Sequence, residues 1–172
     1  MKKLYALLLL VLFTIPIADA GESYDAPDFI LEDVDGNVVE LDALLEEGPI
    51  FMSYWALWCT MCIKEFDALR PYYDEFDSLG INVLAVSVDK ARNVPKVKPF
   101  AKSHKWEYIV VLDPENMMRD LYHVQAMPTS FIINQDKKIV FTHQGYKPGD
   151  EELIVEKIRE LCKKGEEREA EK

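Results

Sequence analysis

Residues 49–66 read PIFMSYWALWCTMCIKEF, and they give the clearest structural signal in the chain. Its first seven residues predict a strand buried on both faces of a sheet, because almost every side chain is apolar. The strand leads into Cys59 and Cys62, after which Ile63 and Phe66 begin an apolar repeat at helical spacing. A buried strand that turns into a helix at a Cys-x-x-Cys pair indicates a redox centre.

The flanking sequence predicts strands alternating with helices. An Asp-Gly turn at Asp35-Gly36 between two short apolar runs predicts an N-terminal β-hairpin. Pro71 should kink the helix that follows the cysteine pair without ending it. Further strands are expected at 81–88, 108–112, 130–133 and 138–142, and further helices at 94–101, 113–121 and 150–164. This order predicts an α/β fold, a mixed sheet with helices on both faces and an added hairpin.

The first twenty residues predict an export signal. A positive start at Lys2 and Lys3 precedes an apolar run, and small residues at 18 and 20 suit a signal peptidase. The run is about 14 residues long, whereas a span needs ~20, although residues 4–18 could remain as a membrane anchor. We therefore expect an exported protein of the periplasm or cell envelope, with residues 1–20 as signal, 21–164 as one folded domain and 165–172 as a charged flexible tail.

Charge and composition restrict the partners. The 172-residue chain has a formal net charge of −11 and no basic patch with interleaved aromatic residues, so nucleic acid is not an expected partner. The sequence indicates no cofactor and no metal site, and we expect a monomer.

The cysteine pair predicts thiol–disulfide exchange. Cys59 would lie at a helix N-terminus, where free N–H groups and the helix dipole stabilise the attacking thiolate. Cys62, one turn further on, can then resolve the mixed disulfide. A zinc half-site or two structural thiols are the alternatives, but no second pair of ligands has suitable spacing. Cys162, on the apolar face of the last helix, is expected to be a buried inert thiol.

Residues 55–66 resemble the active-site segment of the thioredoxin superfamily, and residues 122–133 resemble its second signature, which contains a proline. The lead-in at residues 26–29 and the Asp35-Gly36 turn are similar to the N-terminal addition of the exported TlpA/ResA branch. The resemblance extends over residues 24–163.

This resemblance implies roles for further residues. Pro128 would be a cis-proline that faces the cysteine pair, and the backbone of Met127 would pair with an extended substrate segment near Trp58. Glu65 would exchange a proton with Cys62, because the branch has a glutamate at this position. An exposed helix glutamate is the alternative.

The resemblance also implies the activity: a protein-disulfide reductase acting on envelope proteins, such as apocytochrome c during cytochrome c biogenesis. Its electrons would come from a membrane thiol reductase. The dipeptide Thr60-Met61 departs from the family, which commonly has proline in place of Met61, and this leaves the redox potential open. A thioredoxin-fold peroxidase is disfavoured by Met52 and Ala56, which stand where a peroxidase has Pro and Thr or Ser. A Cu(I) chaperone using the same cysteines with Met61, Met127 or His123 remains a further alternative.

Overall fold

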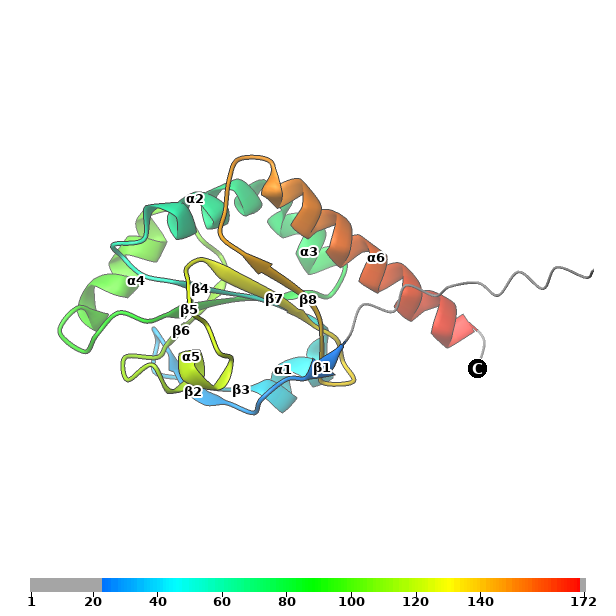
Figure 1. The fold of residues 1–172 in the computed structure, drawn as a ribbon, viewed down its shortest axis with the longest axis horizontal. Helices are drawn as coiled ribbons and strands as arrows, with labels where there is room; N and C mark the ends of the chain where they lie inside the picture. The colour runs from blue at the N-terminus through cyan, green and yellow to red at the C-terminus, as the bar shows by residue number, and fades with distance from the viewer. Residues whose placement is uncertain (1–22, 171–172) are drawn as a thin grey trace, which may run out of the picture.

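The computed structural model describes residues 23–170, and the expected export signal lies outside them. Fifteen elements follow one another along this part of the chain (Figure 1). In order they are β1 (Tyr24–Asp25), β2 (Ile30–Asp33), β3 (Val38–Glu40), α1 (Leu41–Glu47), β4 (Ile50–Trp55), α2 (Thr60–Leu69), the 3-10 turn η1 (Arg70–Tyr72), α3 (Tyr73–Ser78), β5 (Asn82–Ser87), α4 (Val94–Ser103), β6 (Ile109–Leu112), α5 (Met117–Leu121), β7 (Thr129–Ile133), β8 (Lys138–Gln144) and α6 (Asp150–Ala170).

The strands form one mixed sheet in the order β1-β8-β7-β4-β5-β6-β2-β3. The central strands β4, β5 and β6 are parallel, and β7 runs antiparallel to β4 with Ser53 opposite Ser130. All six residues of β4 are buried, as their apolar sequence predicts for a central strand. The expected mixed α/β fold is therefore confirmed.

Helices cover both faces of this sheet. In Figure 1, α2, α3, α4 and α6 lie on one side of the central strands, and α1 and α5 lie on the other. Pro71 was expected to kink the helix without ending it, but α2 ends at Leu69, η1 carries the proline, and a separate helix α3 follows, because proline lacks the N–H that would continue the α-helical hydrogen bonds. The expected hairpin is also present, because β2 pairs with β3 and then joins the sheet beside β6.

Two features at the ends of the fold differ from the expectation. The lead-in contributes a strand of its own, since Tyr24 and Asp25 pair with Ile139 and Lys138 of β8. The last helix was expected to end near Lys164, but α6 continues to Ala170. Arg168 forms an ion pair with Asp136 at 2.9 Å within this extension.

None of the helices between residues 23 and 170 combines the length and the apolar character that crossing a membrane requires.

Candidate active site

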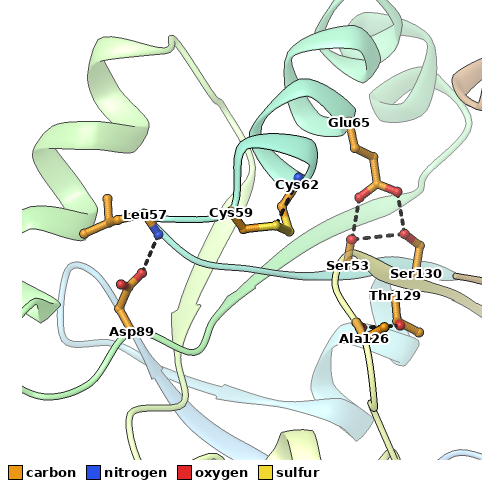
Figure 2. The surroundings of a disulfide bond; sticks show 9 residues. All are labelled: Ser53, Leu57, Cys59, Cys62, Glu65, Asp89, Ala126, Thr129 and Ser130. Atoms are coloured by element: carbon orange, nitrogen blue, oxygen red, sulfur yellow. Dashed lines mark hydrogen bonds between the residues drawn. A yellow bond between two sulfur atoms is a disulfide. The ribbon is translucent and has the colours of Figure 1, made fainter. Parts of the chain in front are cut away.

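The two cysteines form a disulfide at the start of α2, on the turn that leaves β4 (Figure 2). The S–S bond is 2.02 Å and the two Cα atoms are 5.3 Å apart. Cys59 is the N-cap residue of α2, and its Sγ accepts a hydrogen bond from the backbone N–H of Cys62 at 3.3 Å. The first sulfur therefore lies where a helix N-terminus offers backbone donors.

The two sulfurs differ in their access to solvent. Cys59 is 7% exposed and Cys62 is fully buried, while the neighbouring Trp58 is 68% exposed. A large exposed aromatic side chain thus stands beside the more accessible cysteine. A partner can reach Cys59 before it can reach Cys62.

Glu65 lies inside the protein, which excludes the alternative of an exposed helix glutamate. Its side chain is fully buried between β4 and β7, where Ser53 Oγ donates to Oε2 and Ser130 Oγ donates to Oε1, both at 2.6 Å (Figure 2). Burial raises the pKa of Glu65 to about 7, although the two hydroxyl hydrogen bonds act in the opposite direction. Glu65 lies three residues after Cys62, so both start from one face of α2.

The second signature forms a tight segment before β7. The peptide bond between Met127 and Pro128 is cis, as the resemblance implied. Pro128 is buried and its carbonyl accepts from the N–H of Gly145 at 2.8 Å, while the hydroxyl of Thr129 donates to the carbonyl of Ala126 at 2.7 Å. Met127 is half-buried, and no backbone hydrogen bond joins it to another of the residues between 23 and 170.

A second buried carboxylate supports the loop before the cysteines. Asp89 follows β5 and is 1% exposed, and its Oδ2 accepts from the backbone N–H of Leu57 at 2.8 Å and from Ser87 Oγ at 3.2 Å. Figure 2 shows this contact on the side of the disulfide opposite Glu65 and its two serines. Asp89 therefore fixes the backbone two residues before Cys59.

Sequence reasoning did not assign Ser53, Ser130 or Asp89 to the site. Ser53 donates to Glu65, which lies on a different element, so the contact cannot be read from neighbouring residues. A usable signal existed, because each is a polar residue within or directly after a run of buried apolar residues. Such residues are uncommon in a core unless another polar group binds them.

Cys162 is less buried than expected. It is half-exposed on α6 and lies outside the disulfide. It lines a cavity of about 510 Å³ between α6 and the strands β7 and β8, together with Ile132 and Phe141. Leu161 and Cys162 thus line this cavity and also pack against the edge of the core.

The side chains considered as Cu(I) ligands differ in their exposure to solvent. Within residues 23–170, no group of three or more His, Cys, Asp or Glu side chains is placed to hold a metal ion. Met61 and Met127 are half-buried and His123 is exposed.

Known proteins are similar to this chain in sequence and in fold. The model of the AhpC/TSA family matches residues 23–142. The thiol-disulfide oxidoreductase ResA of Bacillus subtilis is 36% identical over 146 residues, which are 85% of this chain and 78% of ResA. A DsbE-like thiol:disulfide interchange protein from Chlorobium tepidum superposes with a TM-score of 0.73 at 29% identity, over 80% of this chain and 95% of that one. A thioredoxin-like protein from Porphyromonas gingivalis gives a TM-score of 0.68 at 32% identity, over 81% and 93% of the two chains. The chain therefore belongs to the AhpC/TSA family of thioredoxin-like proteins and is a thiol–disulfide oxidoreductase.

Proposed function

We propose that the protein is a reductant that transfers two electrons from its cysteine pair to disulfides of other exported proteins. The observation that carries this proposal is the asymmetry of the pair. Cys59 is the more exposed sulfur and receives a helix N-terminal N–H, whereas Cys62 is buried with Glu65 one turn further along α2.

The exchange proceeds in two displacements that start from the reduced pair. The Cys59 thiolate attacks one sulfur of the substrate disulfide, so a mixed disulfide forms and one substrate thiolate leaves. The Cys62 thiolate then attacks Cys59 Sγ, which closes the enzyme disulfide and releases the second substrate thiolate. The substrate gains two electrons and two protons, and the enzyme pair loses them.

Glu65 is proposed to take the proton of the Cys62 thiol as the second displacement begins. A carboxyl group with a pKa of about 7 is partly ionised near neutral pH, so it can accept and return a proton there. Ser53 and Ser130 hold its two oxygens in fixed positions.

Met127 and Trp58 are proposed to bind the substrate. The backbone of Met127 is available to pair with an extended segment, in the way that a strand adds to a sheet edge. Pro128 cannot donate a backbone hydrogen bond and keeps this segment in place. The exposed Trp58 ring offers apolar area beside Cys59.

The substrate and setting follow from the sequence resemblance to the exported TlpA/ResA branch. We propose apocytochrome c, whose haem-site cysteines must be reduced during cytochrome c biogenesis, as a substrate, with a membrane thiol reductase as electron donor. The protein would act in the cell envelope as a monomer after removal of residues 1–20. N-terminal sequencing of the exported form is expected to begin at Gly21, whereas a sequence beginning at Met1 would indicate a retained anchor.

The redox potential tests the direction of the reaction. Thr60-Met61 lacks the histidine that stabilises the thiolate of strongly oxidising relatives, so we expect a potential of about −200 to −300 mV. Equilibration with dithiothreitol or glutathione, followed by the fluorescence of Trp58, measures it. A double variant, Cys59→Ser with Cys62→Ser, is the control and should show no redox-dependent signal. A potential near the roughly −120 mV of a strong oxidant would reverse the assigned direction.

A further inference from the structure

A cavity beside Trp58 contains charged side chains that have no role in the proposed chemistry. It has a volume of about 240 Å³ and is lined by the exposed Trp58 and by residues that follow β5 and β6. Its polar lining consists mainly of cationic and amide side chains: Lys90, Arg92, Arg119, Asn93 and Asn116. One of its lining residues, Trp58, directly precedes Cys59, the more accessible cysteine.

The cations of this cavity are not neutralised within the described fold. In residues 23–170, no carboxylate lies within ion-pair distance of Lys90, Arg92 or Arg119. Elsewhere Lys138 and Arg159 do pair with acidic side chains. The cavity therefore holds three cations outside any ion pair, on a protein whose formal net charge is −11.

Arg119 is held so that part of its guanidinium remains available. Its backbone N–H donates to Asp113 Oδ2 at 2.9 Å, and its Nε donates to the carbonyl of Val124 at 3.2 Å. These contacts fix a half-buried side chain and leave its terminal nitrogens to bind a further acceptor. A guanidinium fork suits a carboxylate, which it can bind through two parallel hydrogen bonds.

One acidic group lines the cavity and offsets part of this charge. Asp89 Oδ2 accepts from Leu57 N–H and Ser87 Oγ, and its Oδ1 is buried without a hydrogen-bond partner among the described residues. Glu115 and Asp120 flank Asn116 and Arg119 along the chain but do not line the cavity. Three cations thus face one buried carboxylate.

We propose that this cavity is a recognition subsite for an acidic side chain of the protein whose disulfide reacts with Cys59. This inference rests on the proposed function and adds to it the chemistry of the preferred substrate: a carboxylate within a few residues of the reactive cysteine. A strongly acidic protein repels acidic partners at long range. At about 0.15 M salt, however, charges more than ~8 Å apart are largely screened. The cations of the cavity therefore select which substrate segment binds beside the disulfide.

Two cyclic peptides with identical Cys-x-x-Cys disulfides test the proposal, one flanked by glutamates and the other by glutamines. The reduced protein is mixed with each peptide in a stopped-flow instrument, and the fluorescence change reports the second-order rate constant. We expect the glutamate peptide to react about fivefold faster at low salt, with the ratio falling towards one at high salt. In a series of peptides with the glutamate one to four positions from the cysteine, the highest rate constant should show which spacing places the carboxylate in the cavity.

A charge-reversed double variant, Lys90→Glu with Arg92→Glu, should abolish this preference and favour a lysine-flanked peptide. The matched control, Lys163→Glu with Lys164→Glu on α6, makes the same change in net charge away from the cavity and should retain the glutamate preference. Equal rates for the glutamate and glutamine peptides in the unaltered protein would overturn the proposal. So would an equal loss of preference in both double variants.

A binding measurement separates this inference from the proposed function. Peptides with serine in place of cysteine cannot react, but they can quench Trp58, which is 68% exposed whereas Trp55 is fully buried and Trp106 is 7% exposed. If the protein reduced neither reactive peptide, the proposed function would fail. An at least fivefold lower Kd for the unreactive glutamate peptide would still support the subsite, and equal Kd values would refute it.

Discussion

Replacing Glu65 with glutamine should change how the stability of the protein depends on pH. Burial raises the pKa of Glu65 from an ordinary 4.5 to about 7, so the folded state binds this proton more tightly than the unfolded chain does. Between these two pH values the folded state holds more protons, and the free energy of unfolding therefore falls as pH rises. Below 4.5 both states are protonated and above about 7 both are ionised, so the loss is confined to this window.

The magnitude follows from the two pKa values. At 1.36 kcal/mol per pKa unit, the loss in free energy of unfolding is roughly 3 kcal/mol over the whole window, of which about 2 to 3 kcal/mol falls between pH 5 and pH 8. Glutamine has the same shape, and its amide can bond both Ser53 and Ser130, but it does not titrate. The free energy of unfolding of Glu65→Gln should therefore rise relative to the unaltered protein by this amount between the two pH values.

Urea unfolding of the oxidised proteins at a series of pH values measures the difference, because the closed disulfide removes thiol titration from the comparison. The control is Glu46→Gln, which removes an exposed carboxyl group on α1. Its free energy of unfolding should depend on pH in the same way as that of the unaltered protein. Parallel profiles for the unaltered protein and Glu65→Gln would refute the reasoning, since Glu65 would then titrate alike in the folded and unfolded states.

Three further predictions concern the remaining site residues. Cys59→Ser should abolish insulin-disulfide reduction, and Cys62→Ser should accumulate mixed disulfides that non-reducing gels detect. Faster alkylation of Cys62 than of Cys59 across a pH series would instead make Cys62 the attacking thiol. Asp89→Ala should lower the free energy of unfolding by about 1–3 kcal/mol, because it removes the acceptor of the Leu57 N–H. Asp89→Asn keeps an oxygen acceptor and should recover most of this loss. Equal urea midpoints for the two variants would contradict the prediction. Cys162→Ser should leave insulin-disulfide reduction unchanged, because Cys162 lies outside the redox disulfide on α6, and a fall in turnover would assign it a redox role.

The elements nearest the cysteine pair could be predicted because their signals are local. The apolar stretch before Cys59 has the composition of a central strand, and Pro71 marks the change from α2 to η1 within one turn. The Asp35-Gly36 turn likewise specifies the hairpin from adjacent residues.

The remaining features depend on contacts between distant parts of the chain. Strand β1 has two residues and no periodicity of its own, and it exists because β8 offers a partner more than a hundred residues away. The sequence favoured an early end for α6 at Gly165, since glycine costs about 1 kcal/mol in a helix. The good helix formers that follow it, and the ion pair between Arg168 and Asp136, outweigh that cost.

The strands at the two ends of the sheet have a consequence for the behaviour of the protein at high concentration. A long unpaired edge strand invites pairing with another chain and leads to aggregation. Here the outermost strands, β1 and β3, are only two and three residues long; β1 pairs with Lys138 and Ile139 at the start of β8, and β3 pairs with β2. The added N-terminal segments therefore shorten the sheet edges that another molecule could pair with, while the strand-pairing site proposed at Met127 stays separate from these margins.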